Sequence, residues 1–257
     1  MSSTTAPIKQ GVQYGFFFDQ SRCIGCSNCV LACIGTKRPP CRVKLLRLYQ
    51  WETGSFPNVR LHIVWAPCYH CENPVCVDEA DGALIKEPNY GAVLIDPDKA
   101  TSSGLKAAWS ACPYGAISFD SDAPDSKAYM CDMCIDRLMI GKFPSCVLAC
   151  PMRALDFGPL TDLQKKYGTS RELEGMPPST LTRPAVVFKP MAEKKSLVPY
   201  DVNEALRLLA NRGGSLPPFY SSPTDVTSIP KGIIARDRLN MKASGKELIL
   251  RTIDDSK

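Results

Sequence analysis

The stretch "CIGCSNCVLAC" at residues 23–33 carries four cysteines in the spacing C-x2-C-x2-C-x3-C. This spacing is typical of a cubane [4Fe–4S] cluster, because three closely spaced thiolates wrap one cluster while the fourth cysteine ligates another. Thiolates suit iron–sulfur chemistry because they are soft and anionic. The stretch therefore predicts a ferredoxin-like fold in which a second cysteine group, distant in the sequence, completes the pair.

Three further cysteine groups follow in the sequence. The second group is "CYHCENPVC", with Cys68, Cys71 and Cys76. The third group retains a single cysteine, Cys112, which is followed by Pro113. The fourth group consists of Cys131, Cys134, Cys146 and Cys150, and Pro151 follows it. The same turn and strand pattern, "CPYGAISFD" and "CPMRALDFG", recurs after Cys112 and Cys150, and this internal repeat favours duplicated lobes.

The ligand sets follow from a pairing rule, in which the last cysteine of one motif completes the cluster of the other. Pairing the outer groups gives cluster site 1, formed by Cys23, Cys26, Cys29 and Cys150. The same pairing gives cluster site 2, formed by Cys131, Cys134, Cys146 and Cys33. Pairing the inner groups gives cluster site 3, formed by Cys68, Cys71, Cys76 and Cys112. The sequence thus predicts three [4Fe–4S] clusters and twelve metal-ligating cysteines.

A fourth site is missing as a unit. Asp19 precedes Cys23 by four residues, and Asp96 precedes position 100 in the same way, yet the third group has no cysteines before Cys112. The four positions where the pairing rule would require ligands hold Ala80, Ala100, Ser103 and Lys106. No ligand of the other three clusters is lost, so we interpret these positions as one emptied cluster site. We expect Trp109 and Tyr114 to fill the space that this cluster would occupy.

Two other uses of the cysteines remain as alternatives. Disulfides are disfavoured, because the thirteen cysteines are an odd number and occur in tight CxxC groups. Cys131, Cys134, Cys146 and Cys150 taken alone resemble a structural zinc site with four thiolates. Cys41 fits no cluster and is expected to be a buried or free thiol. His70, beside Cys71, is expected either to donate a hydrogen bond to a cluster or to have a structural role.

The composition limits the function further. A net charge of +5 on 257 residues is too small to indicate nucleic-acid binding. No apolar run approaches the ~20 residues needed to span a bilayer. We find no export signal and expect a cytoplasmic protein that reaches a membrane only through a partner. We also find no catalytic triad, phosphate loop or dinucleotide fingerprint, so we expect no catalytic residues in this protein.

The expected fold class is α+β, with duplicated ferredoxin-like lobes whose short strands and helices surround the clusters. Short apolar runs at residues 14–19, 61–67, 91–97, 115–120 and 154–158 predict strands. Residues 43–57 predict a hairpin arm. We place a double ferredoxin-like domain at residues 1–160 and an extended C-terminal segment at residues 161–257 that packs on a partner subunit. Within that segment, residues 201–214 predict one helix, which Asp201 caps.

At "CIGCSNC", "PCYHCENPVC", "GAVLIDPDKA" and "CPYGAI", the sequence resembles the ferredoxin-like electron-transfer subunits of the DMSO reductase family of molybdenum and tungsten bis-pterin oxidoreductases. The emptied site resembles that of the pyrogallol–phloroglucinol transhydroxylase small subunit. The resemblance implies a large catalytic subunit that alone holds the pterin metal, with a membrane anchor or a soluble acceptor as onward partner. It implies electron transfer in anaerobic metabolism. The alternative is a transhydroxylase-like or hydroxylase-like enzyme with little net electron flow.

Overall fold

The computed structural model describes residues 10–55 and 59–192. Residues up to Glu193 form one compact unit, here called the first unit. Residues 161–192 pack within it, beside the segments that carry the cysteines, and the predicted division at residue 160 stays a prediction. The helix expected at residues 201–214 lies outside the described residues. Within the described residues, no helix is both long and apolar enough to cross a bilayer.

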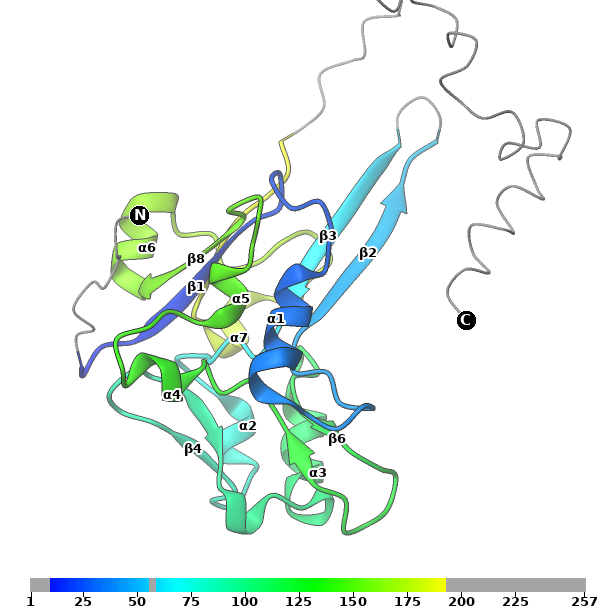
Figure 1. The fold of residues 1–257 in the computed structure, drawn as a ribbon, viewed down its shortest axis with the longest axis vertical. Helices are drawn as coiled ribbons and strands as arrows, with labels where there is room; N and C mark the ends of the chain where they lie inside the picture. Colours follow the sequence, from blue (N-terminus) through cyan, green and yellow to red (C-terminus); the bar gives the residue numbers. More distant parts are fainter. Residues whose placement is uncertain (1–9, 56–58, 193–257) are drawn as a thin grey trace, which may run out of the picture. The chain divides into compact units, whose positions relative to one another are not determined.

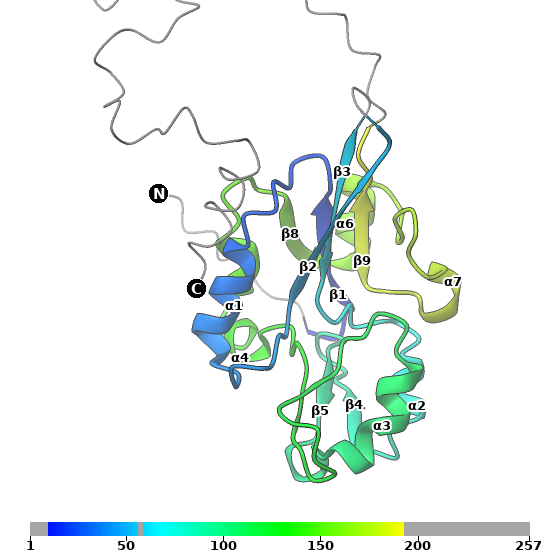
Figure 2. The ribbon, with the colours of Figure 1, turned by 90° about the vertical axis from the view of Figure 1, so that its right-hand side faces the viewer.

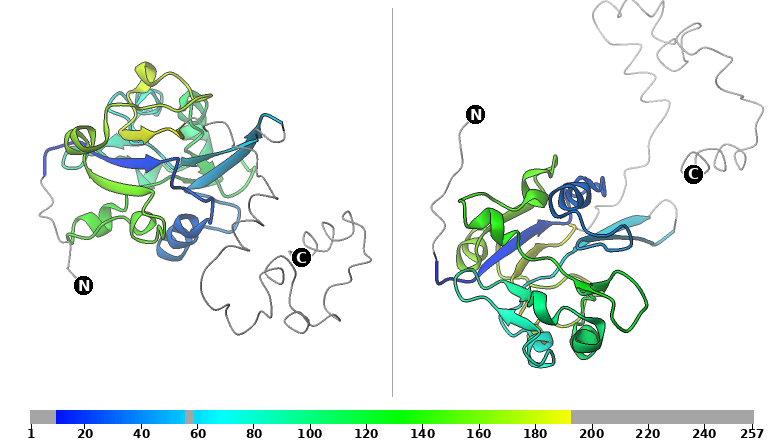
Figure 3. Two further views of the ribbon diagram at one scale, coloured as in Figure 1. Left: turned by 90° about the horizontal axis from the view of Figure 1, so that it is seen from above. Right: turned by 60° about the horizontal axis from the view of Figure 1, so that its bottom comes forward.

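A three-stranded sheet organises the first unit, in the order β8–β1–β9. The central strand β1 (Tyr14–Asp19) pairs antiparallel with β8 (Leu155–Pro159) and parallel with β9 (Val186–Lys189). Figure 3 shows the blue β1 flanked by the other two strands. All six residues of β1 are buried, because both faces of the sheet are covered.

The two faces of this sheet are covered differently, because successive side chains of a strand point in opposite directions. On one face, Phe17 packs with Leu160 and Leu163 of the helix α6 (Leu160–Tyr167). On the other face, Phe16 and Phe18 belong to the main core, which also contains side chains of the helix α1 (Asn28–Lys37) and of α5 (Ser145–Leu148). This second face carries the cysteines of cluster sites 1 and 2.

The predicted arm is a hairpin of β2 (Arg47–Thr53) and β3 (Arg60–Ala66), which projects from the unit in Figure 1. Residues 49–53 of β2, toward the tip of the hairpin, are exposed. Ile63, Val64 and Trp65 of β3, nearer its base, are buried. The hairpin therefore anchors one end in the main core and presents the other to its surroundings. The first unit also contains two single-turn helices, α4 (Ile135–Leu138) and α7 (Ser179–Thr182).

A second core lies below the sheet in Figure 2, where the elements between residues 75 and 129 gather. Two short hairpins and two helices lie there. A 3-10 turn, η1 (Pro97–Lys99), connects the first hairpin to the second helix. The hairpins are β4 (Leu84–Lys86) with β5 (Val93–Ile95), and β6 (Ser118–Phe119) with β7 (Ala128–Tyr129). The helices are α2 (Val75–Asp78) and α3 (Ser102–Ala111). The α+β prediction is confirmed, as mixed helices and small sheets.

Candidate iron–sulfur cluster sites

Cluster site 1 is a pocket on the main core whose lining includes all four predicted cysteines, Cys23, Cys26, Cys29 and Cys150. The loop after β1 supplies the first two, α1 supplies Cys29, and the end of α5 leads into Cys150. Gly25 has φ +70 and lies so close to the Gln50 side chain that a Cβ would collide with it. Only glycine suits this left-handed turn without a steric cost, so the loop can bend its thiols toward one point.

The thiols of site 1 influence one another electrostatically. Burial and the neighbouring Cys23 and Cys150 thiols together raise the pKa of the Cys29 thiol to about 12. Burial also raises the pKa of Cys23, and Cys150 adds to this effect. Cluster ligands must be thiolates, so these thiols lose their protons when a cluster binds. The mutual effect of residues from the first and fourth groups is what the pairing rule predicts.

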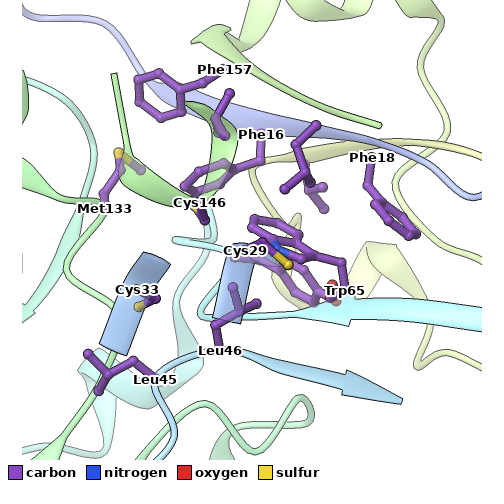
Figure 4. Packing of buried hydrophobic residues seen from close by; sticks show 14 of the residues in the cluster. Phe16, Phe18, Cys29, Cys33, Leu45, Leu46, Trp65, Met133, Cys146 and Phe157 are labelled. Carbon is purple, nitrogen blue, oxygen red and sulfur yellow. The ribbon is translucent and has the colours of Figure 1, made fainter. Parts of the chain in front are cut away.

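Cluster site 2 is a neighbouring pocket whose lining includes Cys33, Cys131, Cys134 and Cys146. Cys33 comes from α1 and Cys146 from α5. Figure 4 shows Cys146 beside Phe16 and Cys33 near Leu45, and Met133 lines the same pocket. Burial, together with the Cys134 thiol, raises the pKa of Cys33 to about 11. The first cysteine motif therefore divides, with three residues at one pocket and the fourth at the other.

An ion-pair clamp joins the two segments that meet at site 2. Lys37 lies in the last turn of α1. Its Nζ is 2.7 Å from Oδ2 of Asp132 and 2.5 Å from Oδ1 of Asp136. These hydrogen bonds raise the pKa of Lys37 although burial lowers it. Met133 and Cys134 both have positive φ, so the loop that carries Cys134 turns tightly. The clamp holds this turn against the helix that carries Cys33.

Cluster site 3 brings Cys68, Cys71, Cys76 and Cys112 together at the junction between the two cores. Burial raises the pKa of Cys68 well above its usual value, and the other three thiols raise it further. Burial, together with the Cys112 and Cys71 thiols, likewise raises the pKa of Cys76 to about 12. Cys112 ends α3, so the third group contributes its one cysteine where the second group needs a fourth ligand.

The three sites form a series. Burial and the nearby Cys134 and Cys33 thiols raise the pKa of Cys146 in site 2. Cys29 of site 1 also contributes to this increase. In the same way, Cys68 of site 3 raises the pKa of Cys131 in site 2. Trp65 of β3 lines both the site 1 and the site 2 pockets. Site 2 therefore adjoins both other sites.

The alternative uses of the cysteines fit less well. All thirteen cysteines lie in the described residues, and all are free thiols there. The predicted zinc set is divided, because Cys150 lines the site 1 pocket whereas Cys131, Cys134 and Cys146 line the site 2 pocket. In the described part of the chain, no group of His, Cys, Asp or Glu closes tightly around one metal ion. A cubane is larger than one ion and holds its thiolates farther apart. Cys41 is exposed and lines neither pocket.

The four emptied positions are divided between the second core, which holds Ala80, and an open hollow that Ser103 and Lys106 line. Ala80 is fully buried near α2, and Leu105 and Ala108 of α3 are fully buried against the same core. Ser103 and Lys106 point outward, because they lie on the exposed face of α3. Trp109 lines the same open hollow as Ser103 and Lys106, whereas Tyr114 lies elsewhere. Trp109 is 47% exposed on α3, and Tyr114 packs edge-on against Tyr69 while its hydroxyl pairs with Thr182.

Two buried donors test whether these sites suit an iron–sulfur cluster. Trp65 Nε1 and His70 Nε2 are buried without a hydrogen-bond partner. His70 Nδ1 accepts from the Val93 N–H at 3.0 Å, so the neutral ring carries its proton on Nε2. Burial, together with the charge of Lys86, lowers the pKa of His70 to about 3. An unpaired buried N–H is costly, and cluster sulfides are acceptors. The donors and the thiol sets therefore fit the cofactor.

Three supporting residues were not predicted from the sequence. They are Trp65, which lines two sites, Lys37, which forms the ion-pair clamp, and Lys86, whose ammonium donates to the backbone of Cys71. A tryptophan in a strand or a lysine in a helix carries no signal of this kind, because it depends on contacts between distant segments. Only His70 could be found beforehand, from its place between two ligands.

This fold and these cysteine sets define an iron–sulfur protein of the ferredoxin-like class. Residues 59–160 match the family model described as a 4Fe-4S dicluster domain. The sequence is 37% identical over 193 residues to the B subunit of anaerobic dimethyl sulfoxide reductase from Escherichia coli (strain K12), covering 71% of this chain and 91% of that protein. It is 34% identical to the corresponding subunit from Haemophilus influenzae (strain ATCC 51907 / DSM 11121 / KW20 / Rd), covering 69% and 89%. Protein NrfC of Escherichia coli (strain K12) is 37% identical over 155 residues, which cover 59% of this chain and 68% of that protein.

The chain therefore belongs to the family of the dimethyl sulfoxide reductase B subunit, the iron–sulfur electron-transfer subunits of molybdopterin oxidoreductases. The resemblance drawn from the cysteine motifs is confirmed at this level.

Proposed function

We propose that this subunit relays electrons through three [4Fe–4S] clusters, in the order site 1, site 2, site 3. The relay connects a molybdenum or tungsten pterin in a large catalytic subunit with an onward acceptor. The observation that carries this proposal is the position of site 2, whose thiols adjoin thiols of both neighbouring sites. A cluster carries one electron at a time, so a series of adjoining clusters provides a path between the two ends.

The proposed fold behind this relay is a pair of duplicated lobes. In the first lobe, β1 precedes Cys23, and Cys150 precedes β8. In the second lobe, β5 precedes position 100, and Cys112 precedes β6. The repeated order of strand, ligand segment, cysteine–proline and strand supports the duplication. One lobe would then hold two clusters, and the other would hold cluster 3 and the emptied site.

The proposed catalytic partner docks over site 1. Cys26 is the most accessible of the proposed ligands, and exposed apolar side chains surround this end of the unit. Ile24 is 60% exposed and Met152 is 41% exposed, and both line the site 1 pocket. Leu31, on the outer face of α1, is also exposed. Apolar side chains gathered around an accessible redox site favour a protein partner over open solvent.

The iron content tests the number of clusters. Three cubanes require about twelve iron atoms and as many acid-labile sulfides per chain. We expect this value for the anaerobically purified complex, after subtraction of any iron held by the other subunits. A reproducible value of about sixteen for this subunit would mean that the emptied site is filled, and the proposed ligand sets would be incorrect. Metal analysis together with integrated paramagnetic resonance of the reduced protein provides the measurement.

Cys76→Ser tests whether cluster 3 is the exit. The variant is expected to lose cluster 3 and to lose turnover with the native acceptor, while a small dye that reaches clusters 1 and 2 still accepts electrons. Both rates are measured on the assembled complex, with Cys41→Ser as the matched control because Cys41 lies outside the cluster sites. Unchanged native turnover without cluster 3 would remove the site from the relay and favour the transhydroxylase-like function.

A further inference from the structure

Lys86, the last residue of β4, places its ammonium group beneath the loop that carries Cys68 and Cys71. Its Nζ donates to the backbone oxygens of Cys71 at 2.6 Å, Gly91 at 2.6 Å and His70 at 3.0 Å. The Gln13 Oε1 atom accepts from it at 2.8 Å. All four acceptors are uncharged, and no carboxylate of the described residues forms an ion pair with this lysine. The cation is therefore held by dipoles, and its charge is not neutralised at close range.

A half-buried cation without an adjacent carboxylate is unfavourable unless negative charge lies nearby. A lysine side chain is ordinarily a cation at neutral pH. The Cys71, Cys68 and Cys76 thiols and the Glu72 carboxylate all act electrostatically on Lys86, and its ammonium donates to the backbone of the loop that carries Cys71. In the loaded protein these ligands are thiolates, so the cluster adds its negative charge to that of Glu72.

In this loop, the backbone N–H and the backbone C=O of His70 bind different partners. His70 has φ +47, a left-handed conformation that is uncommon for residues other than glycine. The backbone N–H of His70 donates to Cys68 Sγ at 3.4 Å, while its carbonyl oxygen accepts from Lys86. The lysine thereby offsets the cost of the turn. The turn presents a donor to the sulfur ligand and keeps the carbonyl oxygens away from it.

We propose that Lys86 is a positioning residue that raises the reduction potential of cluster 3 and so makes site 3 the end at which electrons collect. This inference rests on the proposed relay. Reduction adds one negative charge to an anionic cluster, and a cation held in a partly buried site stabilises the reduced form more than the oxidised form. The hydrogen-bonded loop adds to this effect, because donors to the cysteine sulfurs also favour reduction.

Lys86→Met removes the charge with little change in side-chain length, and Lys106→Met removes an exposed charge from α3 in the same lobe. In the assembled complex, we expect Lys86→Met to reduce the ratio of reduced to oxidised cluster 3 at least tenfold at the wild-type midpoint. For a one-electron couple, this is a downward shift of at least 59 mV. The Lys106→Met midpoint should stay near that of the wild type, because water screens an exposed charge. Redox titration followed by paramagnetic resonance measures both, and Cys76→Ser identifies the cluster 3 signal.

Lys86→Arg should return the midpoint toward the wild-type value, because it restores the charge. A fully loaded Lys86→Met protein with an unchanged midpoint would overturn the proposal. If Lys86→Met does not load cluster 3, Lys86→Gln keeps two donors without the charge and takes its place in the titration. Failure of both neutral variants to load the cluster would make Lys86 a structural residue and would also overturn the proposal. Failure of the relay itself is distinguishable, because Cys76→Ser would then keep its turnover with the native acceptor, whereas the cluster 3 midpoint of Lys86→Met is measured independently of turnover.

Discussion

Cys33→Ser is expected to remove cluster 2 and to leave cluster 1 in place, although Cys33 belongs to the same motif as the cluster 1 ligands. The reason is that Cys33 lines the site 2 pocket with Cys131, Cys134 and Cys146. The variant should lose about four iron atoms per chain. Since site 2 adjoins both other sites, turnover with the native acceptor should fall to near background.

The measurement combines iron analysis, paramagnetic resonance and turnover of the assembled complex. Cys41→Ser is the matched control, because this exposed thiol lies outside the cluster sites. A loss confined to the cluster of Cys23, Cys26 and Cys29 would show that the first motif ligates a single cluster. The crossed assignment of Cys33 and Cys150 would then be incorrect.

The second large effect concerns the packing of the second core. Leu105 of α3 is fully buried in the second core, beside Ala80 and Ala108. We expect Leu105→Ala to destabilise the protein by about 2–5 kcal/mol, because the change leaves a cavity that its neighbours fill only in part. Lys106→Ala, one residue further along the same helix, should change the free energy of unfolding by less than about 0.5 kcal/mol.

Anaerobic denaturant unfolding of the cluster-loaded subunit provides the comparison between the two variants. Equal stabilities would mean that α3 does not seal the second core. That result would contradict the view that the buried face of α3 stabilises the second core. A loss of stability in Leu105→Ala alone would show that the second core depends on this buried leucine.

Much of the fold could be predicted from the sequence, because short apolar runs next to the cysteine motifs mark the strands. The run at residues 14–19 matches β1, and the arm at residues 43–57 begins the hairpin of β2 and β3. Strand β9 lies in the segment that the sequence predicts to be extended, but that segment was expected to pack on a partner. Its four residues carry no signal for their pairing with β1, which depends on the whole intervening sequence.

The ligand sets could be proposed from the sequence because the spacing of the cysteines reflects the size of a cluster. The supporting residues could not be proposed, because their roles depend on contacts between distant segments. Trp109 was expected inside because it is large and apolar, yet the helix turns Leu105 and Ala108 inward instead. In the sequence, Lys86 resembles an ordinary surface cation between apolar residues. Its role depends on the loop carbonyls of His70 and Cys71, which surround its ammonium only in the folded protein.

The parallel pairing of β9 with β1 has a consequence for the order of biosynthesis. Every proposed ligand is synthesised before β9, because the last cysteine is Cys150 and β9 begins at Val186. Phe188 of this strand then packs against Phe18, which lines site 1, and against Tyr69, which lies between two ligands of site 3. The ligand segments are therefore complete in the growing chain before the residues that supply this aromatic cover have been added.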